Sequence, residues 1–158
     1  EFRCLIGSEP VRRSSFDPHQ TLLDFLRLEA RLTGTKEGCA EGDCGACTVL
    51  LGRLRNGALQ YDPVNACIVP LGSVDSTQIL TVEHLADAET HPVQQAMARE
   101  HGSQCGFCTP GMIMTSWQLL ERNPNPSEDE IRHALEGNFC RCTGYHNIVK
   151  SIKEAAGG

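Results

Sequence analysis

The chain has 158 residues, of which 40% are hydrophobic and 22% are charged, an ordinary composition for a globular protein. Its formal net charge is −6, and no run of Lys and Arg offers the basic surface that nucleic acid or an anionic membrane needs. No stretch approaches the roughly 20 apolar residues of a membrane span, and residues 1–7 lack the basic and apolar parts of a secretory signal. We therefore expect a cytoplasmic protein with neither nucleic acid nor a membrane as partner.

The first half of the sequence predicts strands around one helical segment. In residues 2–16, apolar and polar side chains alternate on either side of the turn Gly7-Ser8-Glu9-Pro10. This pattern predicts two short strands. Residues 20–32 change to a helical period. The other predicted strands, in chain order, are 48–51, 64–69 and 78–81, with a hairpin near Asn56 and Gly57. Together they predict a small mixed sheet with one helix, a compact α+β unit.

Beyond about residue 82 the pattern predicts helices only. The first covers residues 91–101, and the second begins at Thr109-Pro110, with Thr109 as N-cap and the proline in the first turn. Ser127 and Glu130 form a capping box that predicts the start of the third helix. The last helix is expected to begin near Thr143. Four short helices joined by tight turns predict an antiparallel four-helix bundle.

Nine cysteines are the unusual feature of the composition. They occupy positions 4, 39, 44, 47, 67, 105, 108, 140 and 142. An odd count without an export signal makes a disulfide framework a poor explanation. Cys4 is expected to be a small buried residue of a strand, and the other eight divide into two sets of four.

The first set has the spacing of a plant-type ferredoxin. Cys39-x4-Cys44-x2-Cys47 is followed by Cys67 after nineteen further residues, which is typical of one [2Fe–2S] cluster. The glycines at 38, 42 and 45 would let this loop turn its peptide N–H groups toward the sulfurs. Zinc is the alternative, but zinc sites usually pair two Cys-x2-Cys knuckles, and this loop has one.

The second set consists of Cys105-x2-Cys108 and Cys140-x-Cys142. Residues two apart do not share a helix face, so the second pair is expected in a turn ahead of the last helix. Cys108 likewise precedes a predicted helix, and helix N-termini favour thiolates. The spacing alone is compatible with either an iron–sulfur cluster or zinc.

Three segments around these cysteines carry a family resemblance. In chain order they are Gly38-Cys39-Ala40-Glu41-Gly42-Asp43-Cys44-Gly45-Ala46-Cys47-Thr48-Val49, Gln104-Cys105-Gly106-Phe107-Cys108-Thr109-Pro110-Gly111 and Gly137-Asn138-Phe139-Cys140-Arg141-Cys142-Thr143-Gly144-Tyr145. With these segments the chain resembles the iron–sulfur part of the molybdenum hydroxylases, the family of xanthine dehydrogenase and aldehyde oxidase. The resemblance covers nearly the whole chain and is closest to the small chain of bacterial xanthine dehydrogenases.

The resemblance implies a fold and a set of ligands. It implies a plant-ferredoxin-like β-grasp domain at residues 1–82, followed by a helical [2Fe–2S]-binding domain at residues 83–158. The implied ligands of the cluster nearer the flavin are Cys39, Cys44, Cys47 and Cys67, and those of the cluster nearer molybdenum are Cys105, Cys108, Cys140 and Cys142. Gln104 and Cys142 stand at the positions that contact the pterin. From the residues alone, a core or cap role is the alternative for Gln104.

The resemblance also implies a role in electron transfer and a set of partners. Electrons would pass singly from a molybdopterin centre through two clusters to FAD, with molybdopterin and FAD held by partner chains or domains. The expected partners are a molybdopterin-binding large subunit and an FAD-binding subunit or domain, in a hetero-oligomer that dimerises. Xanthine or another purine is the expected substrate of the complex; an aldehyde, CO or an aza-aromatic compound is the alternative.

Two hypotheses of other classes remain at this point. A stand-alone ferredoxin-like carrier predicts a polar surface around the second set of cysteines, whereas a docked subunit predicts exposed apolar side chains there. A zinc-stabilised interaction module predicts a colourless protein. We expect no substrate-transforming site in this chain, because its histidines have no metal-ligand spacing and no Ser-His-Asp pattern is present.

Overall fold

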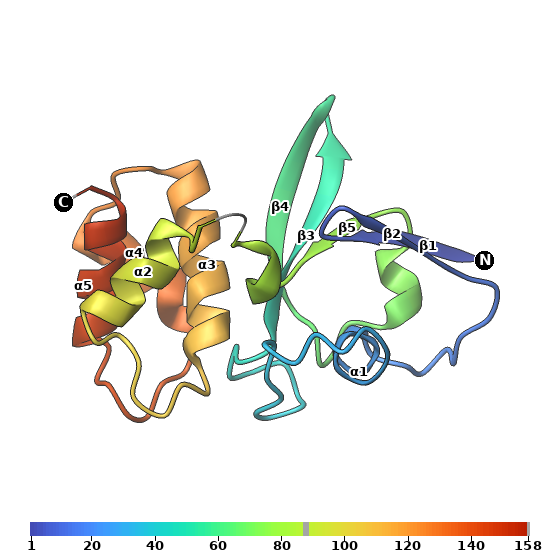
Figure 1. Cartoon of the computed structure of the whole chain (residues 1–158), viewed down its shortest axis with the longest axis horizontal. Helices are drawn as coiled ribbons and strands as arrows, with labels where there is room; N and C mark the ends of the chain where they lie inside the picture. Colours follow the sequence, from blue (N-terminus) through green and yellow to red (C-terminus); the bar gives the residue numbers. More distant parts are fainter. Residues whose placement is uncertain (87–88, 158) are drawn as a thin grey trace.

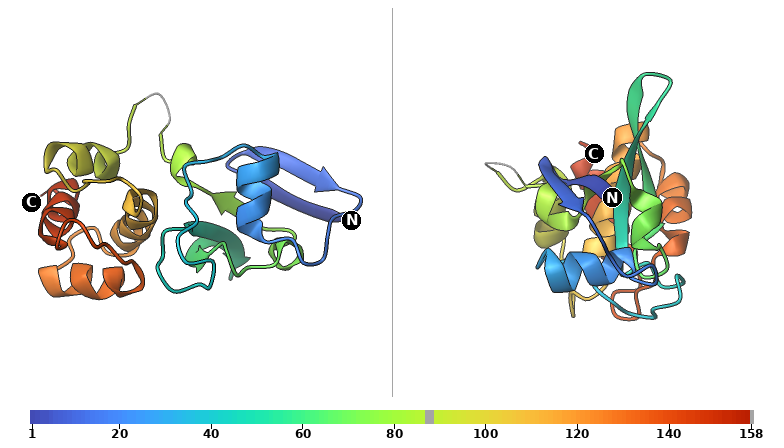
Figure 2. Two further views of the ribbon diagram at one scale, coloured as in Figure 1. Left: turned by 90° about the horizontal axis from the view of Figure 1, so that it is seen from below. Right: turned by 90° about the vertical axis from the view of Figure 1, so that its right-hand side faces the viewer.

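A five-stranded mixed sheet and a group of helices form the two ends of the computed structural model, which describes residues 1–86 and 89–157 (Figure 1). The strands are β1 (Phe2–Ile6), β2 (Glu9–Arg13), β3 (Thr48–Arg55), β4 (Ala58–Asn65) and β5 (Gln78–Leu80). The predicted α+β class is therefore confirmed. Figure 2 shows the N-terminus on the sheet part and the C-terminus on the helical part.

The sheet has the order β2-β1-β5-β3-β4, with β1 and β5 parallel and the other pairs antiparallel. Both predicted hairpins are present. In the second, Asn56 and Gly57 have φ of 53° and 79°, the left-handed backbone that a two-residue hairpin turn requires. The predicted strand at 64–69 is wrong, because this hairpin pairs β3 with Ala58–Asn65 instead.

The helix predicted for residues 20–32 of the sheet part is shorter than expected. It consists of α1 (Leu22–Asp24), whose N-cap Thr21 accepts the N–H of Asp24, and a π-helical turn, η1 (Phe25–Glu29). Arg31 has a φ of 60°, so the backbone leaves the helical conformation before the predicted end at residue 32. Leu22, Phe25 and Leu26 are at most 1% exposed and form the inner face of this segment. Cys4 is buried in β1, as predicted.

The helical part holds four α-helices within the described residues. They are α2 (Pro92–Arg99), α3 (Thr109–Arg122), α4 (Glu128–Ala134) and α5 (His146–Ala155), and the short 3-10 turns of the chain are η2 (Leu71–Val74), η3 (Val82–His84) and η4 (Leu135–Gly137). The capping box of Ser127 and Glu130 is confirmed. The N-cap of α3 is Cys108, so the prediction of Thr109 is wrong by one residue.

The start of the last helix is also corrected. Gly144 and Tyr145 have φ of 63° and 67°, and this left-handed backbone delays α5 to His146, three residues after the predicted start at Thr143. The antiparallel arrangement of the four helices and the division at residues 82 and 83 stay predictions. Residues 87, 88 and 158 of the predicted second domain lie outside the described residues.

The two parts share one continuous interface along α3. This helix lies beside β3 and β4 (Figure 1). The Trp117 ring meets Tyr61 of β4 edge to face, with centroids 5.4 Å apart. In β3, Leu51 packs into the core of the sheet part, whereas its neighbour Leu50 packs into the core of the helical part. Successive residues of a strand point to opposite faces, so the first part of β3, residues 48–52, is buried on both sides.

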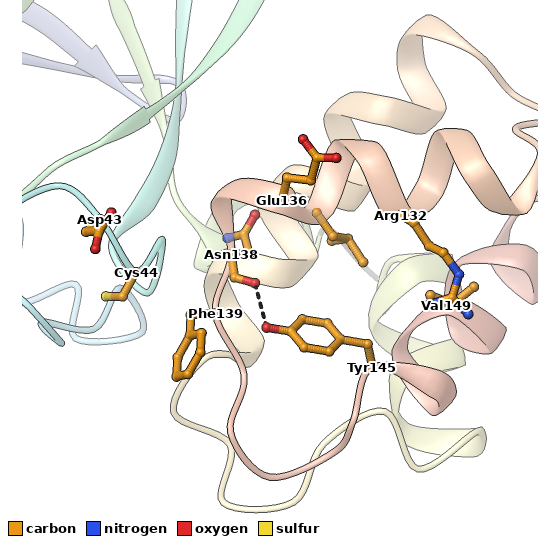
Figure 3. Close-up of a pocket in the computed structure, with 9 residues that line it drawn as sticks. Asp43, Cys44, Arg132, Glu136, Asn138, Phe139, Tyr145 and Val149 are labelled. Carbon is orange, nitrogen blue, oxygen red and sulfur yellow. Dashed lines mark hydrogen bonds between the residues drawn. The ribbon is translucent and has the colours of Figure 1, made fainter.

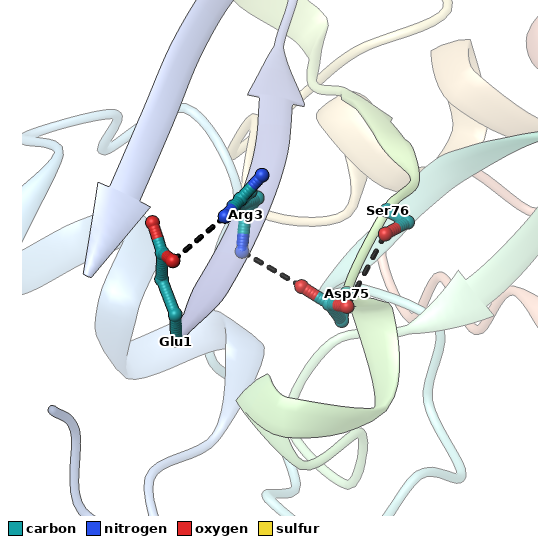
Figure 4. Close-up of polar contacts among 4 residues, drawn as sticks. All are labelled: Glu1, Arg3, Asp75 and Ser76. Carbon is teal, nitrogen blue, oxygen red and sulfur yellow. Dashed lines mark hydrogen bonds and ion pairs between the residues drawn. The ribbon is translucent and has the colours of Figure 1, made fainter. Parts of the chain in front are cut away.

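The free end of β1 is anchored by a carboxylate. Asp75 Oδ1 accepts the backbone N–H of Arg3 at 2.7 Å, and the Arg3 guanidinium pairs with Glu1 at 2.7 Å (Figure 4). The Arg3 hydrogen bond keeps the pKa of Asp75 below its ordinary value. Among the described residues, every helix is too short or too polar to cross a membrane.

Candidate metal centres

The register of the β3–β4 hairpin brings the two buried thiols of the first set together. Thr48 and Asn65 are directly opposite in the ladder. Cys47 immediately precedes this pair and Cys67 follows it by two residues, and the N–H of Ala66 donates to the Cys47 carbonyl at 3.2 Å. The Cys47 and Cys67 side chains consequently interact directly, and both are buried, at 2% and 8% exposure.

The other two thiols of the first set lie on the loop ahead of β3. Cys39 Sγ accepts the backbone N–H groups of Asp43 and Cys44, each at 3.4 Å. These amides and that of Glu41 lower the pKa of Cys39 to about 6, so its thiolate is favoured. Burial does the opposite at Cys47, whose pKa rises to about 12. Metal binding must therefore displace a proton from Cys47.

Glycine is required in this loop for two different reasons. Gly45 has a φ of 70°, and a Cβ there would collide with the carbonyl of Gly137. At Gly38 an added Cβ would lie 2.8 Å from Cys44 Sγ. Gly42 also has a positive φ, so the expected backbone freedom is confirmed at two of the three glycines. At Gly38 the requirement is close approach to a thiol.

The second set gathers from the start of α3 and the segment before α5. Cys105 and Cys142 are exposed, with their sulfurs 3.7 Å apart. Cys108, the N-cap of α3, interacts with Cys140, which is buried. Burial raises the pKa of Cys108 to about 12. Burial opposes ionisation of Cys140 as well, but hydrogen bonds from the side chain and backbone of Thr143 lower its pKa overall.

Each set therefore consists of two close pairs of thiols. The pairs are Cys39 with Cys44 and Cys47 with Cys67 in the first set, and Cys105 with Cys142 and Cys108 with Cys140 in the second. In the described part of the chain, no three His, Cys, Asp or Glu side chains converge on one point as a single metal ion requires. A two-iron core is larger and takes two thiolates on each iron. The donor sets and their pairing fit such a core.

Other residues singled out from the sequence lie around these thiols. Gln104 and Arg141 are exposed next to Cys105 and Cys142. The acidic residues Glu37, Glu41 and Asp43 are exposed on the first loop.

Two family models match the chain. A model described as "2Fe-2S iron-sulfur cluster binding domain" matches residues 8–72, and one described as "[2Fe-2S] binding domain" matches residues 81–153. The quinoline 2-oxidoreductase structure from Pseudomonas putida 86 contains a chain that is 39% identical, with a TM-score of 0.86; the match covers 98% of this chain and 91% of that one.

The chain belongs to the molybdenum hydroxylase family. Within the family it is an iron–sulfur electron-carrying domain pair, with one [2Fe–2S]-binding domain in each half.

Larger molybdenum hydroxylases contain the same pair of domains. Aldehyde oxidase 1 of Rattus norvegicus is 45% identical over 152 residues, which are 94% of this chain and 11% of that protein. Xanthine dehydrogenase/oxidase of the same species is 44% identical over 160 residues, 99% of this chain and 12% of that protein. The chain thus spans about an eighth or less of the length of these curated relatives.

Sequence reasoning missed the residues that join the two sets of thiols. Asn138 and Phe139 hydrogen bond between the loops, and Tyr145 hydrogen bonds within the second loop; none of the three is a cysteine. Asn138 and Phe139 directly precede Cys140, and this position was the available signal. Their partners lie 93 and 95 residues earlier in the chain, at Gly45 and Cys44, which no spacing rule predicts.

Proposed function

We propose that the eight thiols hold two separate [2Fe–2S] clusters with four ligands each. The ligands of the first are Cys39, Cys44, Cys47 and Cys67, and those of the second are Cys105, Cys108, Cys140 and Cys142. When bound, such clusters supply one-electron redox chemistry. The observation that carries the proposal is that each half, matching a [2Fe–2S]-binding family, gathers four thiols into two close pairs.

The chain's own residues tune and shield these sites. The amides of Asp43 and Cys44 stabilise negative charge on Cys39. The Ile68 side chain lies over Gly42, where a Cβ would collide with it. Phe107 reaches from the second loop to the first, with its ring 3.5 Å from the Cβ position of Gly38. These apolar side chains limit the access of water to the thiols.

We propose that the chain works as a docked subunit or domain, passing electrons from a molybdopterin centre to FAD. Phe107 and Phe139 are 46% and 59% exposed beside the second set of thiols. This supports a partner surface over the polar surface of a stand-alone carrier. Gln104, which precedes Cys105 in the chain, and Cys142, whose sulfur lies 3.7 Å from that of Cys105, are both exposed and would face the pterin.

We propose the assembly that the family resemblance implies. Its partners are a molybdopterin-binding subunit and an FAD-binding subunit or domain, in a dimerised, cytoplasmic hetero-oligomer. We further propose that residues 1–82 and 83–158 form its two domains.

We propose xanthine or a related purine as the substrate of the complex. The segment from His91 to Gln95 supports this by its resemblance to xanthine dehydrogenases. An aldehyde is the second candidate, because identity to aldehyde oxidase 1 is 45% against 44% for xanthine dehydrogenase/oxidase. Assaying the native complex with purines, aldehydes, CO and aza-aromatic compounds distinguishes these substrates.

The metal content of the protein purified without oxygen tests the cluster assignment. We expect about four irons and four sulfides per chain, with visible absorption that dithionite bleaches, because two [2Fe–2S] clusters contain that number of each. Zinc in place of iron, or a colourless protein, would contradict the proposal and favour an interaction module.

Single substitutions test the division into two sets. Cys39→Ser should perturb one paramagnetic signal of the dithionite-reduced protein, and Cys105→Ser should perturb the other, because each removes a ligand from one cluster only. Cys4→Ser is the matched control, since Cys4 is a buried cysteine of β1 that belongs to neither set. Loss of both signals from one substitution in a folded protein would show that the eight thiols are divided differently.

A further inference from the structure

The loops that carry the two sets of thiols are joined through Asn138. This residue is 5% exposed and lies between η4 and Cys140. Its side-chain amide donates to the Gly45 carbonyl at 3.1 Å, and its Oδ1 accepts the hydroxyl of Thr115, on α3, at 2.8 Å. A buried amide with both ends satisfied has one orientation. Asn138 therefore holds the first loop, the second loop and α3 in fixed positions.

The backbone next to Asn138 makes a parallel link. The N–H of Phe139 donates to the carbonyl of Cys44 at 2.9 Å. Cys44 and Cys140 are ligands in the proposed assignment. This hydrogen bond therefore connects Phe139, which precedes a ligand of the second site, to Cys44, a ligand of the first.

Glycines allow this close approach. A Cβ at Gly111 of α3 would collide with the Gly45 carbonyl, the group that accepts the Asn138 amide. Gly45 in turn has no room for a Cβ against Gly137. The three segments are in backbone contact, so a change at Asn138 is transmitted directly to both loops.

A third set of contacts fixes the second loop from the other side. Tyr145 Oη donates to the Asn138 carbonyl at 3.3 Å and accepts the Cys140 N–H at 2.8 Å (Figure 3). Figure 3 shows Asn138 between the loop of Cys44 and the ring of Tyr145. The positive φ of Tyr145 is a conformation that costs a non-glycine residue free energy and persists where surrounding contacts hold it.

We propose that Asn138 is a positioning residue that sets the separation and relative orientation of the two iron–sulfur sites. The inference rests on the proposed ligand assignment. Its side chain does not touch a cluster; it acts by tying Gly45, between two ligands of the first site, to the segment that carries Cys140. Removing the amide leaves all eight thiols in place but lets the two loops shift relative to one another.

The magnetic interaction between the two sites is the measurement that tests this role. Two paramagnetic sites at a fixed short separation split or broaden each other's spectra, and the effect appears only when both are reduced. In the full-length protein, Asn138→Leu has similar volume without the amide. We expect it to retain iron and sulfide and to lose most of the splitting that distinguishes the fully reduced from the half-reduced spectrum.

Two further variants make the test specific. Asn65→Leu is the matched control, because the Asn65 amide donates to the Gly42 carbonyl within the first loop and does not reach the second. It should keep the wild-type splitting. Thr115→Val removes only the hydroxyl that orients Asn138 and should reduce the splitting partially. If Asn138→Leu fails to fold or to retain iron, Thr115→Val decides the question.

The outcomes separate this inference from the ligand assignment. Wild-type splitting in Asn138→Leu with both sites loaded would overturn the positioning role, as would the absence of splitting in the wild type. A wild-type protein without iron signals would instead overturn the assignment itself. A lower melting temperature in Asn138→Leu with unchanged splitting would show a structural role only, and would also overturn the inference.

Discussion

At the scale of single residues, the tightest constraint on the site is at Gly45. Its φ of 70° costs any other L-residue about 1–2 kcal/mol, and a Cβ would also collide with the Gly137 carbonyl. Gly57 has a φ of 79° with no atom within 4 Å of its Cβ position. The two glycines thus differ in surroundings and share a backbone conformation.

This difference predicts unequal effects of the same substitution. Gly57→Ala should lower the free energy of unfolding by about 1 kcal/mol, the backbone cost alone. Gly45→Ala should lower it by roughly 3 kcal/mol, because the collision displaces the second loop. Urea unfolding of the cluster-loaded protein, followed by circular dichroism, measures both. Equal losses would mean that the loops separate easily and that the contact between them is weak.

The sequence indicated which thiols come together, but not which residues surround them. Cysteine spacing is a strong signal because a small inorganic core restricts the ligand positions that a loop can offer. The role of Gly45 was visible only as local backbone freedom. Its contact with Gly137 depends on how α3 packs against the sheet, and no local pattern encodes that packing. For the same reason Asn138 was not identified.

At the scale of elements, the short turn η3 contains a titratable cap. The N–H of Thr81 donates to Nδ1 of His84 at 3.2 Å, which requires the imidazole to be neutral. Burial lowers the pKa of His84 below its ordinary value, while Glu83 opposes the shift. As the pH falls through about 6.5, the unfolded chain takes up a proton that the folded chain refuses. Stability should therefore decrease as the pH falls from about 6.5 toward the folded pKa of His84. Below that pKa the loss is complete.

Replacing the imidazole by an amide isolates this effect. His84→Gln keeps an acceptor at the third position of the turn, as in a Thr-x-x-Gln capping box, and removes the titration. We expect a shallower loss of thermal stability between pH 8 and pH 5.5 than in the wild type. His91, whose pKa is also lowered by burial, contributes to the remaining slope. His19→Gln, at an exposed position, should keep the wild-type slope; an unchanged slope in His84→Gln would refute the assignment.

Elements marked by turn and cap residues were predicted well. Asn56-Gly57 and Ser127 located a hairpin and a helix start correctly, because each acts through its own backbone. The start of α5 was wrong by three residues because Tyr145, an ordinary helix residue, has a left-handed backbone. The Cys140 N–H and the Asn138 carbonyl hold its hydroxyl there, through side-chain hydrogen bonds within the loop that the residue types do not predict.

At the scale of the whole molecule, β3 is the element that both cores share. Leu50 is fully buried in the core of the helical part, and Leu51 is 1% exposed in the core of the sheet part. Both halves are thus expected to unfold together. Sequence analysis predicted each half, yet it did not predict this shared strand, because a short apolar run does not show which partner covers each face.

Two neighbouring substitutions test the coupling. Leu50→Ala and Leu51→Ala should each cost about 2–5 kcal/mol, since each leaves a cavity. Only Leu50→Ala should separate unfolding into two steps, because of the two it alone removes a contact between the halves. The fluorescence of Trp117, the single tryptophan of the chain, reports the interface while circular dichroism reports both halves. Coincident transitions in Leu50→Ala would show that the α3 interface holds the halves together without this side chain.

A strand buried on both faces also limits how the molecule can be divided. Expressed alone, the N-terminal half would turn Leu50 of β3 toward water, on the side of the sheet where the aromatic ring of Tyr61 lies. The C-terminal half would in turn leave the Trp117 side of α3 uncovered. Truncation between the two [2Fe–2S]-binding domains should therefore yield fragments prone to aggregate. Substituting the ligands of one site in the intact chain is the better route to a protein with a single cluster.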